Sequence, residues 1–229
     1  MSRRFARTAL AAAGLTLLFG GTATAAPAAP AGGTDTPRSC EGVRLTGSLP
    51  VPPAGLSARQ AVTIGEDCTP VPGEVRYVPA GSAPGAAREA GVAAADSAGR
   101  HVRGWNEMYD CCNIRMTGLY TTADWDTAGG RITTASSGAT QGWNREPWDA
   151  GWSLASAANT QDCSADCGSV TAGADASFTY RGIFDATGDR YANTHRTSVR
   201  LNADGTAACT FDVELKHTFI GWNWQHGCE

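Results

Sequence analysis

The segment from Cys209 to Phe219 alternates strictly between two classes of side chain. One set of alternate positions carries apolar residues and one histidine: Cys209, Phe211, Val213, Leu215, His217 and Phe219. The positions between them carry polar residues: Thr210, Asp212, Glu214, Lys216 and Thr218. A period of two places the two sets on opposite faces of a β-strand. The segment is therefore predicted to lie in an antiparallel sheet with one buried face and one face in water.

The same period recurs along the chain from Trp105 onward. Strands are predicted over residues 114–121, 131–134 and 177–185, and turns at 128–130 and 202–205. All seven tryptophans lie in this part of the chain, and aromatic side chains bury large areas in a protein core. We therefore predict a mostly β fold, in which residues 105–229 form an antiparallel sandwich or barrel-like domain that disulfides stabilise.

The chain before this domain is rich in proline and poor in aromatic residues. Its predicted divisions are a disordered leader at 26–39, a small disulfide-stapled segment at 40–79 and a linker or short helix at 80–104. Within the stapled segment, residues 43–45 and 75–78 are predicted strands. Residues 57–60 match a helix capping box, but the β-branched residues that follow at 62–64 favour a strand.

The first 25 residues have the three parts of a secretory signal peptide. A basic start with Arg3, Arg4 and Arg7 precedes an apolar stretch, and Ala23–Ala25 supplies the cleavage site. No later apolar run reaches the roughly 18 residues of a membrane span, so a secreted, extracellular protein is expected. Cleavage removes three of 18 basic residues and none of 22 acidic ones, which argues against nucleic acid as a partner. The preference for arginine over lysine is typical of a GC-rich bacterial genome.

An even set of eight cysteines in a secreted chain predicts four disulfides. The expected pairs include Cys40 with Cys68, which have no other cysteine nearby, and Cys163 with Cys167. Cys111 and Cys112 are adjacent, and neighbouring residues of a strand point to opposite faces. We therefore expect each to bond to a different partner, with Cys209 and Cys228 as the candidates. A strained bridge between Cys111 and Cys112 is the alternative.

The tryptophans are the candidate ligand-binding residues. Trp222 and Trp224 are two residues apart and share one face of a strand, whereas Trp143, Trp148 and Trp152 cluster farther upstream. Indole rings beside polar residues could stack on the sugar rings of an extracellular polysaccharide. Counting by twos from Phe219 places Trp222 and Trp224 on the face opposite the apolar set. Either another sheet covers that face and these rings are core, or the face is open and they form a binding platform.

No residue is assigned a catalytic role. Ser153 lies in a sequence that resembles a nucleophile elbow, but no helical period follows it. His195 could supply a base, although its polar surroundings favour a turn, and the register of His217 predicts a core histidine. The candidate carboxylate pairs for glycoside hydrolysis are Glu146 with Asp149 and Asp124 with Asp126. Asp185, Asp189 and Asn193 could bind calcium, but their spacing matches no twelve-residue calcium loop.

These observations favour a non-enzymatic function and predict neither a cofactor nor a metal. The leading hypothesis is an extracellular binding or structural module, with a polysaccharide or another secreted protein as its partner. The first alternative is a secreted hydrolase of the glycosidase or esterase type, which needs a cleft with a convergent acid and base. The second is a proteinaceous protease inhibitor, which needs an exposed loop braced by a disulfide.

Overall fold

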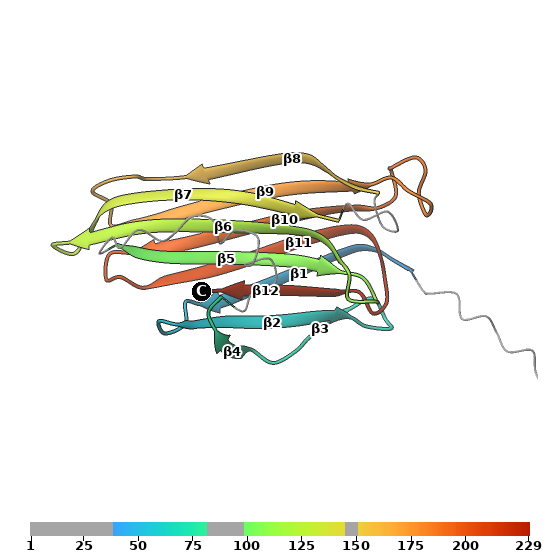
Figure 1. The fold of residues 1–229 in the computed structure, drawn as a ribbon, viewed down its shortest axis with the longest axis horizontal. Helices are drawn as coiled ribbons and strands as arrows, with labels where there is room; N and C mark the ends of the chain where they lie inside the picture. Colours follow the sequence, from blue (N-terminus) through green and yellow to red (C-terminus); the bar gives the residue numbers. More distant parts are fainter. Residues whose placement is uncertain (1–38, 82–98, 145–150) are drawn as a thin grey trace, which may run out of the picture. The chain divides into compact units, whose positions relative to one another are not determined.

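The computed structural model describes residues 39–81, 99–144 and 151–229. Within these ranges the chain forms twelve β-strands and no helix (Figure 1). Every pairing between strands is antiparallel, and the pairings divide the strands into two sheets. The predicted mostly β, antiparallel fold is therefore confirmed. None of the described residues belongs to a helix long and apolar enough to cross a membrane.

Sheet A contains five strands in the order β1-β11-β10-β9-β8. Their bounds are Ser39–Pro50 for β1, Ala207–Phe219 for β11, Ala192–Asn202 for β10, Ser169–Tyr180 for β9 and Trp152–Gln161 for β8. Sheet B has the order β3-β2-β12-β5-β6-β7, and β4 also pairs with β2. Its bounds are Pro70–Pro72 for β3, Leu56–Ile64 for β2, Asn223–Cys228 for β12, Arg100–Tyr109 for β5, Arg115–Ala128 for β6, Arg131–Trp143 for β7 and Arg76–Pro79 for β4.

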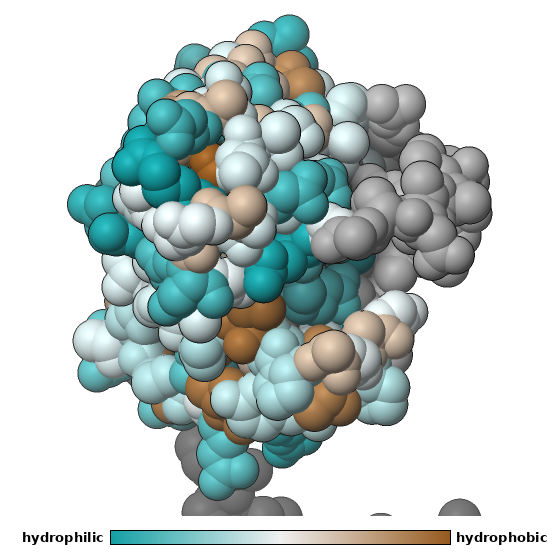
Figure 2. Space-filling view, turned by 90° about the vertical axis from the view of Figure 1, so that its left-hand side faces the viewer, coloured by the Kyte–Doolittle hydropathy of each residue, from teal (hydrophilic) through white to brown (hydrophobic). Residues whose placement is uncertain are grey.

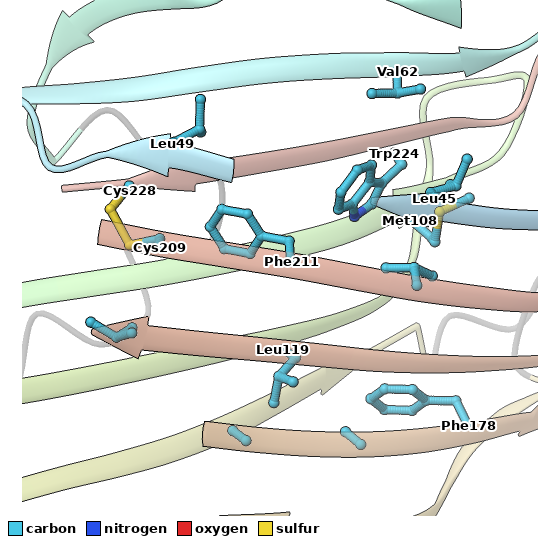
Figure 3. Close-up of a cluster of buried hydrophobic side chains, with 14 of the residues drawn as sticks. Leu45, Leu49, Val62, Met108, Leu119, Phe178, Cys209, Phe211, Trp224 and Cys228 are labelled. Carbon is cyan, nitrogen blue, oxygen red and sulfur yellow. A yellow bond between two sulfur atoms is a disulfide. The ribbon is translucent and has the colours of Figure 1, made fainter. Parts of the chain in front are cut away.

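The inner faces of the two sheets meet in one hydrophobic core (Figure 3). Alternate residues of β11 supply Phe211, Val213 and Leu215, which are at most 3% exposed, so the predicted alternation is confirmed. Leu119 and Trp224 face them from sheet B and are fully buried. The arrangement is that of a sandwich, in which each strand buries every second side chain against the opposite sheet.

The chain changes sheets between β11 and β12. β11 ends at Phe219, Gly221 adopts a left-handed φ of +84°, and β12 begins at Asn223 in the other sheet. The prediction that counted by twos through this segment was wrong, because a turn interrupts the strand. Trp224 therefore points into the same core as the apolar face of β11, but from the opposite sheet.

Three disulfides form among the described residues, and two of them were predicted: Cys40 with Cys68 and Cys163 with Cys167. The third joins Cys209 of β11 to Cys228 of β12 and so links sheet A to sheet B (Figure 3).

The prediction that Cys111 and Cys112 bond to Cys209 and Cys228 was wrong. Cys228 pairs with Gly104 early in β5, whereas Cys111 follows the end of that strand. At about 3.3 Å per residue, roughly 20 Å separates the two positions. Cys111 and Cys112 lie in a turn, not in a strand, and both are free thiols in this structure.

The Cys40–Cys68 disulfide staples residues 40–79, and their strands also pair with later strands and so form part of the sandwich. β1 pairs with β11 along its length, and β2 pairs with β12. Residues 57–60 lie in β2, where strand pairing and β-branched neighbours prevail over the capping box. Residues 100–104, predicted within the linker, already belong to β5. The predicted signal peptide, residues 26–38 of the leader, and residues 82–98 lie outside the described ranges.

Candidate functional site

A cavity of about 450 Å³ lies at one end of the sandwich. The strand ends and turns that surround it are at the right of Figure 1, where β5, β9 and β11 end and β8 begins. Of the ten described residues that line it, eight are apolar or aromatic: Met116, Trp152, Tyr180, Phe184, Tyr191, Phe219, Ile220 and Trp222. The other two are Asp110 and Cys111 from the turn between β5 and β6. The opposite end of the molecule shows teal and white residues with several brown, hydrophobic groups among them (Figure 2).

The aromatic rings of the cavity pack against one another across the strand ends. Trp152 is the register partner of Tyr180, and their ring centroids are 5.6 Å apart. Tyr191 then contacts Tyr180 edge-on at 5.9 Å and stacks on Phe219 at 5.9 Å. Trp222 completes the row, 5.6 Å from Phe219. Since each ring is held by its neighbours, the walls are formed before any ligand binds.

Large apolar side chains are exposed at the same end of the sandwich. Ile183 is 86% exposed and Phe184 67% exposed in the loop between β9 and β10, while Ile114 is 43% exposed in the β5–β6 turn. Phe184 stacks on Tyr180 with a centroid distance of 6.5 Å, so it continues the aromatic row out to solvent. Exposed apolar groups beside an apolar cavity are typical of a binding site.

Asp185 holds the β9–β10 loop in place. Its carboxylate accepts hydrogen bonds from the hydroxyl of Thr187 and from the backbone N–H groups of Gly188, Arg190 and Tyr191. The bond from Thr187, followed by those from the backbone, lowers the pKa of Asp185. Of the oxygens proposed as calcium ligands, those of Asp185 therefore accept hydrogen bonds from the loop itself. Among the described residues, no cluster of three or more histidine, cysteine or acidic side chains is arranged to hold a metal.

Asp110 organises the turn on the other side of the cavity. Its Oδ1 accepts hydrogen bonds from the backbone N–H groups of Cys112 and Ile114, both at 2.8 Å. Asn113 follows with a left-handed φ of 60°, which suits asparagine in a tight turn. Cys111 and Cys112 project from this turn with their sulfurs 3.6 Å apart. The hydrogen bond between the Cys111 and Cys112 thiols, and then burial, raise the pKa of the Cys111 thiol.

The structure separates the tryptophans that the sequence grouped. Trp222 and Trp152 line the cavity, although only 7% and 4% of their surfaces are exposed. Trp224 is fully buried in the core, so it forms no open platform with Trp222. Trp143 is half-buried and packs on Phe178, with centroids 6.2 Å apart. Trp148 lies outside the described residues.

His195 lies in the strand β10, where a turn had been favoured. It is fully buried between the sheets, with Nδ1 against the amide oxygen of Asn106 and Nε2 2.8 Å from the hydroxyl of Thr117. Burial lowers its pKa to about 3, so the ring is neutral at neutral pH and is closed off from substrates. His217 is 2% exposed, as its register predicted, and its ring meets that of Tyr191 at 4.7 Å.

The other catalytic candidates do not come together. Ser153 is exposed on β8, a strand and not the turn into a helix that an elbow requires. Asp124 and Asp126 are exposed on β6, where Asp124 pairs with His101 and Asp126 accepts a bond from Thr134. The carboxylates of Glu146 and Asp149 lie outside the described residues. Asp189 is exposed, whereas Asn193 is buried and donates a hydrogen bond to the hydroxyl of Thr117, so these two residues do not form a common site.

A second polar cluster lies on the face of sheet B that points away from the core. Glu107 is fully buried and accepts hydrogen bonds from Tyr109, Tyr120 and Arg115. Burial, followed by the charge of Glu107, raises the pKa of both tyrosines. Gly118 gives the carboxylate side chain its room, because a Cβ there would lie 3.1 Å from Cγ of Glu107. The hydrogen bonds of Glu107 go to other members of the cluster, which is typical of residues that stabilise the fold.

Sequence reasoning missed most of the cavity. Tyr180, Tyr191 and Phe219 were noted only as strand residues or not at all, and Cys111 only as a disulfide partner. Each lies at the end of a strand or in the loop that follows. Aromatics at strand ends are a visible signal, but only the strand order shows that these particular ends adjoin.

Comparison with known proteins gives no information about the function of this site. No protein-family model matches the chain, and no curated protein matches it. One similar solved structure is a protein of unknown function from the DUF3598 family of Nostoc punctiforme PCC 73102, with 11% identity and a TM-score of 0.14. The match covers 75% of this chain and 66% of that chain. At that TM-score the likeness supports no statement about fold or function.

Proposed function

We propose that the protein is a secreted binding module that takes a small apolar molecule with a planar ring into the end cavity. The observation that carries the proposal is the preformed row of rings from Trp152 to Trp222 around a space of about 450 Å³. Sites for small molecules typically measure 300–1,000 Å³, with mostly apolar walls and a few polar groups. The signal-like first 25 residues and the three disulfides support secretion.

The polar groups of the cavity favour an apolar ligand over a sugar. A sugar needs several groups that converge on its hydroxyls, whereas Asp110 is the one charged residue among the lining residues that the structure describes. Its Oδ1 is already engaged by two backbone N–H groups of its own turn. Among the described lining residues Asp110 is the one carboxylate and there is no histidine, so they provide neither the carboxylate pair of a glycosidase nor the histidine base of an esterase. The experiment below therefore also tests whether the cavity binds a polysaccharide.

The test is a fluorescence titration of the secreted protein with 1-anilinonaphthalene-8-sulfonate, excited through tryptophan. We expect saturable binding with energy transfer, because Trp152 and Trp222 line the cavity. Phe184→Ser removes an exposed ring of the mouth and should weaken binding roughly fivefold, since partial loss of a phenylalanine contact costs about 1 kcal/mol. The matched control is Tyr77→Ser, which removes a ring of similar exposure from β4.

Two results would contradict the proposal. One is the absence of saturable binding to the native protein, and the other is equal weakening by both substitutions. Competition separates the ligand classes: naphthalene should displace the probe, whereas cello-oligosaccharides should not. Displacement by the sugars alone would favour the polysaccharide hypothesis.

A further inference from the structure

Cys111 and Cys112 combine three features within the described part of the chain. Both thiols are exposed, whereas the other six cysteines are bonded in pairs. Their sulfurs are 3.6 Å apart. Cys111 also lines the aromatic cavity, so chemistry at this pair changes a wall of the candidate site.

We propose that Cys111 and Cys112 form a reversible vicinal disulfide at the cavity mouth, and that its formation tightens ligand binding. The first part stands on the geometry of the turn. The second part rests on the proposed function, because it needs a ligand in the cavity.

Hydrogen bonds of the turn backbone, and not a bond between the sulfurs, bring the two sulfurs close together. Asp110 anchors the backbone N–H groups of Cys112 and Ile114, and the N–H of Asn113 donates to the carbonyl of Asp110 at 3.2 Å. A disulfide bond is about 2.04 Å long, so the sulfurs must approach by about 1.5 Å. Side-chain rotation and a small change in the turn supply that movement. A ring closed across adjacent residues is strained, which makes the bond easier to reduce than an ordinary disulfide.

The oxidant is a small disulfide, such as oxidised glutathione, which an oxidising compartment supplies. One thiol loses its proton to water, and its sulfur attacks the small disulfide to give a mixed disulfide and one thiolate. The second thiol then loses its proton and attacks the protein sulfur of the mixed disulfide. This forms the Cys111–Cys112 bond and releases a second thiolate. The two released thiolates take up two protons, so the protein has lost two hydrogens and the oxidant has become two thiols.

Exposure separates this pair from the other disulfides. Each of the three other bonds contains at least one buried cysteine, since Cys40 is 2% exposed, Cys167 is 4% exposed, and Cys209 and Cys228 are fully buried, so a reductant in water reaches these bonds slowly. Cys111 and Cys112 are exposed on a turn. A mild thiol reductant should therefore open the vicinal bond while the buried bonds stay closed.

Closing the ring changes the wall that a ligand meets. The thiol hydrogen of Cys111 is lost and its side chain can no longer rotate, so the wall becomes rigid and less polar. A ligand then does not have to order this side chain when it binds. Fixing one side chain in advance corresponds to roughly three- to tenfold tighter binding.

The first experiment measures the disulfide alone. The full secreted chain is exposed to oxidised glutathione in alkaline buffer, alkylated with N-ethylmaleimide without reduction, and mapped by mass spectrometry. We expect a peptide holding Cys111 and Cys112 that is unlabelled and lighter by two hydrogens, and mild dithiothreitol should restore labelling of these two residues only. Labelling of both after oxidation, stable glutathione adducts, or covalent dimers would overturn the proposal.

The second experiment measures 1-anilinonaphthalene-8-sulfonate affinity in both redox forms. The oxidised wild type should bind three- to tenfold more tightly than the mildly reduced protein, and a Cys111→Ser/Cys112→Ser variant should show the weaker affinity in both conditions. The control variant Cys163→Ser/Cys167→Ser lacks another short-range disulfide and should keep the full redox response. Equal affinity of the two forms overturns the coupling. Failure of both forms to bind counts against the proposed function, while the disulfide is judged by mass alone.

Discussion

The buried histidines should make the protein sensitive to acid. The amide oxygen Oδ1 of Asn106 lies against Nδ1 of His195 and also accepts the indole N–H of Trp224 at 3.4 Å. Because Oδ1 is an acceptor, Nδ1 must donate to it, and Nε2 accepts a hydrogen bond from the hydroxyl of Thr117. Its Nδ1 therefore carries the proton in the neutral ring. A second proton on Nε2 would place a charge in a fully buried site with no carboxylate among these partners. Burial accordingly lowers the pKa of His195 to about 3 from an ordinary 6.5.

His226 lies in an apolar part of the same core. Its ring stacks on Trp224 at 4.0 Å and meets Phe211 at 5.1 Å, and no described residue hydrogen-bonds either ring nitrogen. Burial lowers its pKa to about 4. Both histidines are thus neutral in the folded protein at pH values where the unfolded chain binds a proton.

The magnitude follows from proton linkage. Above pH 6.5 neither state binds these protons, and the free energy of unfolding keeps its full value. As the pH falls below 6.5, both histidines become protonated in the unfolded chain. In the folded protein they stay neutral until the pH approaches their pKa values, about 3 for His195 and about 4 for His226. At about pH 4.5 each histidine then lowers the free energy of unfolding by about 2.5 kcal/mol. A total of about 5 kcal/mol is comparable with the whole stability of many domains.

Urea denaturation between about pH 7.5 and 4.5 measures this fall. The substitution His226→Leu, which is close to volume-conserving, should change stability little at pH 7.5 and recover about 2.5 kcal/mol at pH 4.5. His101→Gln, at an exposed site on β5, controls for removal of a surface histidine. A flat pH profile in the wild type, or an equally steep fall in His226→Leu, would refute the reasoning.

Two further predictions concern contacts between sheet A and sheet B. Replacing both Cys209 and Cys228 by alanine should cost about 3 kcal/mol in urea unfolding, because their separation of 19 residues closes a sizeable loop in the unfolded chain; a loss below about 1 kcal/mol would contradict this. Gly47→Ala should cost about 1–3 kcal/mol in thermal unfolding, since its Cβ would lie 2.5 Å from His226 Nε2. Gly138→Ala, where the nearest atom would be 3.6 Å away, should be nearly neutral, and equal losses would show that packing is not the cause.

Local features of the sequence were enough to predict some strands, such as β11, but not β8, and the strand predicted over residues 177–185 is observed over Ser169–Tyr180. Alternation between Cys209 and Phe219 predicted both the strand and its buried face, because the two-residue period of a strand is a property of the backbone. The Cys40–Cys68 bond was also predictable, since no other cysteine lies near either residue in the chain. These inferences needed no knowledge of which strands adjoin.

The cavity and the remaining cysteine pairing were decided by tertiary structure. Gly221 turns the chain from one sheet to the other, which puts Trp222 in the cavity, Trp224 in the core and Cys228 beside Cys209. A turn of this kind, over residues 220–222, changes the sheet and the face that a side chain occupies, and the alternation on either side does not reveal it. The rings that line the cavity come from strands far apart in sequence. Their meeting depends on strand order, which long-range pairing sets and no local pattern encodes.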